Sequence, residues 1–226
     1  LVVMAAASPA VGWLEAPDGA IDEGALHEGD ARVETRLITD VDQVAPGDTI
    51  RVAVAFSMDD HWHIYWQNPG DAGVPTKIDW QSDQVEFGPL KWSIPKMFQE
   101  SGGELTVFGY EDRIILYSEA TVAEDATGTV DLSAKVDYLA CSNACMPGHS
   151  RLERTIPVGT ETKRADREVL SALETYSARV PRPAEEFGLE VNAVYSQTPI
   201  RPEDSFTAAL EVVVFDGVVP KQLLAR

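Results

Sequence analysis

The feature that most constrains the fold is an alternation of apolar and polar residues that recurs between residues 31 and 158. It is clearest from Gly128 to Tyr138, where every second side chain is apolar. A period of two is typical of a β-strand that buries one face. The same kind of pattern predicts further strands at Val33–Leu37, Ile50–Phe56, Trp62–Trp66, Thr76–Trp80, Leu105–Tyr110, Arg113–Ser118 and Arg151–Val158.

Turns rich in glycine and proline separate these strands, and no helical period occurs among them. Ala45–Asp48 is one such turn, and Asn68–Asp71 has Pro69 and Gly70 at the central positions of a type II turn. Short strands without intervening helices predict a mainly β fold, an immunoglobulin-like antiparallel β-sandwich. Phe87–Gly103 is long and irregular, so we expect a loop that packs over another part of the domain.

The period changes after Gly159. Apolar residues then recur at the spacing of one amphipathic helix, at Ala165, Val169, Leu173, Tyr176 and Val180. Strand patterns return at Leu189–Tyr195 and Phe206–Phe215. We therefore predict four parts: a signal-peptide remnant and flexible lead-in at 1–30, an immunoglobulin-like domain carrying the cysteine pair at 31–160, a helix with a proline-rich linker at 161–186, and the start of a second β-module at 187–226.

The chain is strongly acidic, with a formal net charge of −19. Residues 1–150 contain 25 acidic and 8 basic side chains, so the first domain carries most of this charge. A surface of this sign repels phosphate backbones, and we expect no nucleic-acid partner. No apolar run approaches the roughly 18 residues that a membrane-spanning helix needs.

The only two cysteines, Cys141 and Cys145, lie in one short segment where the Gly128–Tyr138 strand pattern ends. Pro147 and Gly148 then indicate a turn before the next strand. A disulfide between the cysteines would close a small loop, which restrains the unfolded chain little. Two thiols in one loop are instead suited to disulfide exchange, because one attacks a partner disulfide and the other resolves the mixed disulfide. A local structural disulfide stays open as an alternative.

Three segments together resemble the periplasmic amino-terminal domain of the DsbD family of thiol:disulfide interchange proteins, and its ScsB-like (suppressor of copper sensitivity) branch in particular. These segments are Trp62–Thr76, Gly109–Glu111 and Asp137–Gly148. The resemblance implies an immunoglobulin-like domain in the periplasm, probed by exported proteins and belonging to a protein anchored in the inner membrane. It implies a protein-disulfide reductase that needs no cofactor.

The resemblance also implies partners and roles. Electrons would come from a membrane-embedded domain of the same family and pass to periplasmic thioredoxin-like or disulfide-isomerase proteins. Cys141 and Cys145 would be the catalytic pair, with Cys145 forming the intermolecular bond. Phe87–Gly103 and Glu104–Phe108 would contain a loop that caps them. The implied neighbours of the pair are His63, Tyr65, Phe108, Tyr110, Tyr138 and Pro147. For His63, a strand position facing solvent is an equal alternative.

A copper-binding module for copper tolerance is the alternative function. Thiolate and thioether groups suit Cu(I), and four candidate ligands lie within nine residues: Cys141, Cys145, Met146 and His149. Zinc fits less well, because two cysteines and one nearby histidine leave a tetrahedral site incomplete.

Overall fold

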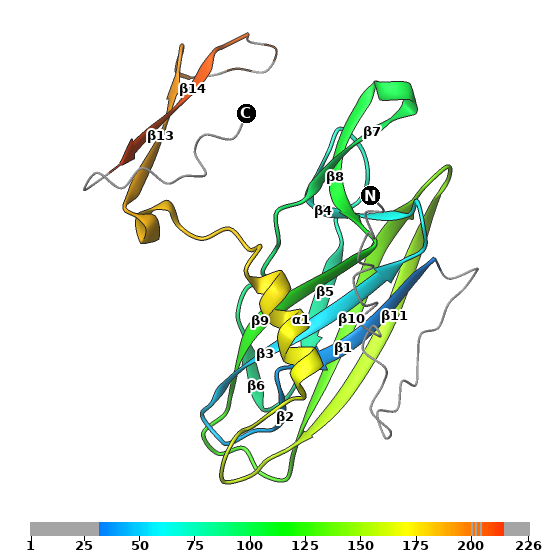
Figure 1. Ribbon diagram of the computed structural model, residues 1–226, viewed down its shortest axis with the longest axis vertical. Coiled ribbons are helices and arrows are strands. Elements are labelled where there is room, and N and C mark those ends of the chain that lie inside the picture. Colours follow the sequence, from blue (N-terminus) through cyan, green and yellow to red (C-terminus); the bar gives the residue numbers. More distant parts are fainter. Residues whose placement is uncertain (1–31, 200, 202, 204, 215–226) are drawn as a thin grey trace, which may run out of the picture. The chain divides into compact units, whose positions relative to one another are not determined.

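The computed structural model describes residues 32–199, 201, 203 and 205–214. The predicted lead-in at 1–30 lies outside the described residues. The chain divides into two compact units, one ending at Val180 and the other beginning at Pro181. The first unit is a sandwich of two antiparallel sheets with one helix against it (Figure 1). The domain boundaries drawn from the sequence at residues 160 and 186 remain a prediction.

The first sheet has four strands, in the spatial order β1 (Val33–Thr39), β3 (Thr49–Met58), β9 (Arg113–Val122) and β6 (Val85–Phe87). The second has the order β11 (Cys145–Pro157), β10 (Thr129–Cys141), β4 (His63–Gly70), β8 (Leu105–Glu111) and β7 (Lys96–Glu100), with β5 (Lys77–Gln81) also paired to β10. A short 3-10 turn, η1 (Ser101–Gly103), joins β7 to β8. The immunoglobulin-like sandwich predicted from the sequence is confirmed.

The core lies between the two sheets and follows the alternation seen in the sequence. Every second residue of β10 from Val130 to Tyr138 is buried. Phe56 of β3 meets the Tyr138 ring edge-on, with 6.2 Å between the ring centroids. Trp62 and Trp66, expected in the core, are partly buried and pack against it.

The helix α1 (Arg167–Ser177) covers the outer face of the first sheet (Figure 1). It begins because the Asp166 side chain accepts a hydrogen bond from the backbone N–H of Val169, at 2.9 Å. Leu173 is its buried residue and packs among side chains of the sheet. The predicted amphipathic helix is confirmed, and it ends before Pro181.

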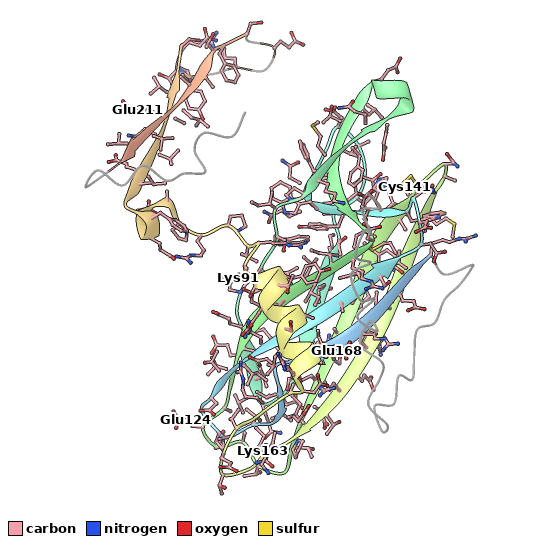
Figure 2. The ribbon with its side chains drawn as sticks, in the orientation of Figure 1. Lys91, Glu124, Cys141, Lys163, Glu168 and Glu211 are labelled. Carbon is pink, nitrogen blue, oxygen red and sulfur yellow. A yellow bond between two sulfur atoms is a disulfide. The ribbon has the colours of Figure 1, made fainter. Side chains whose placement is uncertain are left out.

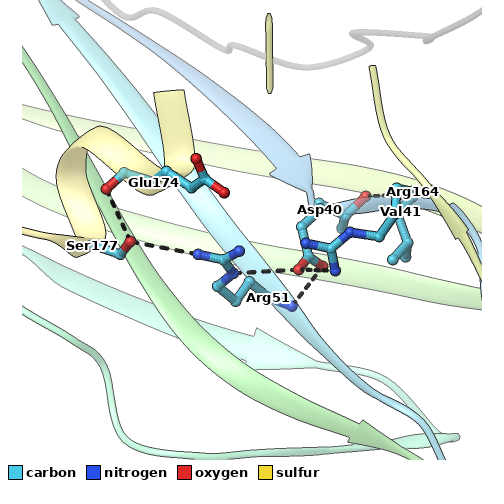
Figure 3. A network of polar contacts seen from close by, with 7 residues as sticks. Asp40, Val41, Arg51, Arg164, Glu174 and Ser177 are labelled. Carbon is cyan, nitrogen blue, oxygen red and sulfur yellow. Dashed lines mark hydrogen bonds and ion pairs between the residues drawn. The ribbon is translucent and has the colours of Figure 1, made fainter. Parts of the chain in front are cut away.

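A buried carboxylate fixes the segment that leads into α1 (Figure 3). Asp40 follows β1 and accepts hydrogen bonds from the Arg51 backbone at 2.8 Å, the Arg51 side chain at 3.3 Å and Arg164 at 3.1 Å. Arg164 belongs to β12 (Lys163–Arg164), which pairs with β2 (Val41–Gln43). Arg51 also donates to Ser177 Oγ at the end of α1, at 3.5 Å.

Two predictions about irregular structure were wrong. Asn68–Asp71 was expected to be a turn, but β4 runs through Gly70. Gly70 has the positive φ of 90° that the prediction implied, and the ladder to β8 shifts register there without ending. Phe87–Gly103 was expected to be a loop, but it contains β7. Adjacent apolar residues, Met97 facing outward and Phe98 inward, conceal its period of two.

The turn indicated by Pro147 and Gly148 was also misplaced, because both residues lie inside β11. The chain reverses earlier, at Ser142–Ala144. β11 is an edge strand, which tolerates a proline. Gly148 is required by packing, because a Cβ there would collide with the Tyr138 ring.

The second unit contains η2 (Ala184–Phe187) and an antiparallel hairpin of β13 (Leu189–Tyr195) and β14 (Ala208–Val214). Both predicted strands are present, although the second begins two residues later than expected and Phe215 lies outside the described residues. Val194 and Leu210 are among its exposed apolar side chains. Within the described part of the chain, no helix has the length and apolar character needed to cross a bilayer.

Candidate functional site

The two cysteines form a disulfide at the tip of the β10–β11 hairpin. Cys141 ends β10, Cys145 begins β11, and the two are register partners with Cα atoms 4.1 Å apart. The intervening turn is closed by a hydrogen bond from the Ser142 N–H to the Ala144 carbonyl, at 3.1 Å. Strand pairing therefore brings the two sulfur atoms together at the end of the longest hairpin of the sandwich.

The two cysteines differ in exposure. Cys141 is only 1% exposed and packs with the buried side chains of Tyr65 and Val107. Cys145 is exposed. The difference arises because Cys141 has a second strand beside it, pairing with His63 of β4, whereas Cys145 lies on the edge strand. A thiol arriving from solution therefore meets the Cys145 sulfur first.

The β7–β8 hairpin lies beside Cys141 and covers it (Figure 2). Phe98 of β7 packs against the cluster that contains Cys141. Its ring stacks on His63 with 4.7 Å between the ring centroids and 16° between the planes. Met97, the next position on β7, is 63% exposed, as expected for a strand whose side chains alternate between faces.

A carboxylate joins this cover to the strand beneath it. Glu100 Oε1 lies 2.9 Å from His63 Nε2 and 3.0 Å from Tyr65 Oη. Tyr65 donates its O–H to this oxygen. Burial, together with the hydrogen bond to Glu100 and its charge, raises the pKa of Tyr65 well above its ordinary value of 10. Tyr65 therefore keeps its proton and remains a donor throughout the physiological pH range.

Close packing around Tyr65 requires a glycine in the segment after β4. Gly73 has a φ of 99°, and a Cβ at this position would collide with the Tyr65 ring. The neighbouring Ala72 packs against the cluster that contains Cys141. The Ala72–Gly73 segment thus closes one side of the site, and the β7–β8 hairpin closes another.

The structure gathers some of the predicted site residues and not others. His63 and Tyr65 lie next to Cys141, so His63 is buried rather than facing solvent. Pro147 lies on β11, two residues after Cys145 and on the same strand face. Tyr110 and Tyr138 point into the sandwich core, where their hydroxyls donate to the carbonyls of Ser93 and Val33. Phe108 alternates with Val107 and lies on the face of β8 away from Cys141.

The four residues of the copper alternative do not converge. Met146 and Cys145 are adjacent on β11, so their side chains point to opposite faces. His149 Nδ1 lies 2.5 Å from Asp137 Oδ1. Over the residues that the structure describes, no cluster of three or more His, Cys, Asp or Glu side chains could hold a metal ion. The copper site remains a prediction.

Two residues of the site were not identified from the sequence. Glu100 was concealed in the segment expected to be a loop, although its spacing of two from Phe98 is the signal that could have revealed it. Val107 was interpreted as an ordinary strand residue, but it packs directly against Cys141. In both cases the position of a partner strand decides the role.

A β-sandwich whose hairpin tip carries one covered and one exposed disulfide sulfur defines a domain built for thiol:disulfide exchange. The family model of the amino-terminal domain of the thiol:disulfide interchange protein DsbD matches residues 34–157. The chain belongs to this family. Among curated proteins, no sequence matches the chain.

Solved structures give the same fold. The N-terminal periplasmic domain of ScsB from Proteus mirabilis aligns with a TM-score of 0.52 and 15% identity, covering 91% of this chain and 85% of that domain. The reduced DsbD N-terminal domain of Neisseria meningitidis aligns with a TM-score of 0.32 and 16% identity, covering 57% of this chain and 90% of that one.

Proposed function

We propose that this chain is a periplasmic protein-disulfide reductase domain. It would receive two electrons from a membrane-embedded domain of its family and pass them to periplasmic thioredoxin-like or disulfide-isomerase proteins. The observation that carries the proposal is the unequal exposure of the two sulfurs, with Cys145 open to solvent and Cys141 covered. Family membership supports exchange, and the periplasmic location of the ScsB domain supports the compartment.

Reduction of the pair takes two steps. A thiolate of the donor attacks Cys145 Sγ, the Cys141–Cys145 bond breaks, and Cys141 leaves as a thiolate that takes up a proton. The second thiol of the donor, as its thiolate, then attacks the donor sulfur of the mixed disulfide and releases Cys145. The donor ends with a disulfide and this domain with two thiols, so two electrons have moved.

The substrate is reduced by the reverse sequence. The Cys145 thiolate attacks the substrate disulfide and forms a mixed disulfide. Cys141, as its thiolate, then attacks Cys145 Sγ, restores the Cys141–Cys145 bond and releases the substrate as a dithiol. Cys141 is held next to Cys145 by strand pairing, so this resolving step is intramolecular and has a high effective concentration.

The cover over Cys141 fits this role. A reduced pair in an oxidising compartment is exposed to oxidants other than its substrate. Phe98, Tyr65 and Val107 pack around Cys141 and limit access to it. A protein partner docking at the hairpin tip would meet Cys145 first.

The test combines a potential with two variants. The oxidised full-length chain is equilibrated with graded thiol buffers, and the pair is then alkylated and weighed. We expect a reduction potential above about −300 mV, in the range of exchange-active pairs. A much lower potential would identify the bridge as structural.

The variants test the order of attack, with a reduced thioredoxin-type protein as donor and its disulfide form as acceptor. C141S retains the exposed thiol and should accumulate a mixed disulfide with the acceptor. C145S retains only the covered thiol and should form almost none. Equal trapping by both variants would contradict the assignment of Cys145 as the attacking residue.

A further inference from the structure

The two faces of β7 have different roles. Phe98 and Glu100 are two residues apart and lie on the face that looks towards Cys141, whereas Met97 points to solvent. Phe98 provides an apolar cover, and Glu100 provides the polar contacts. The inner face of one short strand therefore supplies both the cover and its attachment.

The backbone alone holds β7 weakly. β7 is the last strand of its sheet and pairs only with β8 among the described strands. The ladder between β8 and β4 is interrupted between Tyr65 and Gly70. Side chains that reach from β7 across to β4 therefore matter for keeping the cover in place. The hydrogen bonds that do so end on Glu100.

The chemistry of these hydrogen bonds suits a strong but local attachment. An ionised carboxylate only accepts hydrogen bonds, so His63 Nε2 and Tyr65 Oη both act as donors. Bonds to a charged acceptor are stronger than those between neutral groups. The Glu100 side chain is 24% exposed, so water can replace these donors when the hairpin moves.

We propose that Glu100 is a positioning residue that fastens β7 to His63 and Tyr65 and thereby keeps Phe98 over Cys141. This inference rests on the proposed function, because the cover has a purpose only if the reduced pair exchanges. Glu100 then sets how often the Cys141 thiol is uncovered without a partner. A protein docking at the tip would displace the attachment.

Alkylation of the reduced, full-length chain by iodoacetamide tests the proposal, with each cysteine followed separately by mass spectrometry. We expect E100A to alkylate Cys141 about tenfold faster, which corresponds to about 1.4 kcal/mol in the opening equilibrium. The rate at Cys145 should change less than about twofold, since that sulfur is already exposed.

E100Q separates attachment from charge. The amide of glutamine keeps an acceptor oxygen but has no charge, so it should restore most of the protection of Cys141, to within about threefold of the unmodified chain. If E100Q were as fast as E100A, the effect would come from the lost charge acting on thiol ionisation, and the proposal would be overturned.

E111A is the matched control. Glu111 lies on the same hairpin and pairs with Lys96 at 2.5 Å, without a printed role at Cys141. Its removal should leave the Cys141 rate unchanged, and an acceleration equal to that of E100A would contradict the proposal. Y65F removes one of the two donors and should give about threefold, with no further increase in the double variant with E100A.

The alkylation assay contains no partner protein. A pair that fails to exchange with the thioredoxin-type probe would overturn the proposed function, whereas the attachment would still be measured by the protection of Cys141. An E100A variant with unchanged protection would overturn the attachment and leave the exchange function standing.

Discussion

Two carboxylates hold structural elements in the sandwich, and they do so differently. The Asp40 side chain is 4% exposed and uses both oxygens, with donors from Arg51 and Arg164 (Figure 3). The Glu100 side chain is 24% exposed and uses one oxygen, with donors from His63 and Tyr65. The first joins β1, β3 and β12 where no movement is needed. The second holds a hairpin that must uncover a sulfur, so depth of burial separates a permanent anchor from a reversible one.

The largest expected effect comes from breaking the permanent anchor. D40A leaves Arg51 without its buried partner and should lower the free energy of unfolding by about 3 kcal/mol. E100A, the matched change at the more exposed carboxylate, should lower it by less than about 1.5 kcal/mol. Urea unfolding of both variants measures the difference, and equal losses would contradict the distinction between the two carboxylates.

The disulfide should contribute less than Asp40 to stability. Removing it in the double variant C141A/C145A opens a five-residue loop, whose closure is worth about 2 kcal/mol in the chain-entropy model. The far-ultraviolet circular dichroism spectrum should be unchanged, and exchange should be lost. A variant that fails to fold would show that the bridge is a structural requirement.

The smallest effect concerns an exposed pair further along the same hairpin. The hydrogen bond from His149 is the main cause that holds the pKa of Asp137 below its ordinary value of 3.8. Because the folded-state pKa is lowered, the resulting stabilisation is present above pH 3.8 and is lost as the pH falls through the folded-state pKa.

H149A should therefore raise the pKa of Asp137 towards its ordinary value, as followed by NMR titration of the side-chain carboxyl. His149 is largely exposed, so unfolding stability at neutral pH should change little. A pKa of Asp137 that is the same in H149A would assign the lowering to Lys135 instead.

The strands and the helix could be predicted from the sequence because each has a clean period that burial imposes. The alternation of β10 and the spacing of Leu173 in α1 are local properties of the chain. The site was only partly predictable. The short distance between the cysteines indicates a pair, but the covering of Cys141 depends on β4 and β8, which are remote in sequence.

The errors share a physical cause. Pro147 and Gly148 have the composition of a turn, yet an edge strand accepts the proline and the Tyr138 ring needs the space above the glycine. Met97 is apolar but exposed, which conceals the strand that carries Phe98 and Glu100. Residue type indicates local preference, whereas the neighbouring strand decides which preference is used.

The packing of α1 has a practical consequence for recombinant work on this domain. The residues that α1 covers, Ile38, Ala53, Ile115 and Tyr117, form an apolar patch on the outer face of the first sheet. A fragment ended at Val158, where the strand pattern stops, would leave this patch in contact with water. We expect such a fragment to self-associate during purification, whereas one continued through Val180 would keep its own cover.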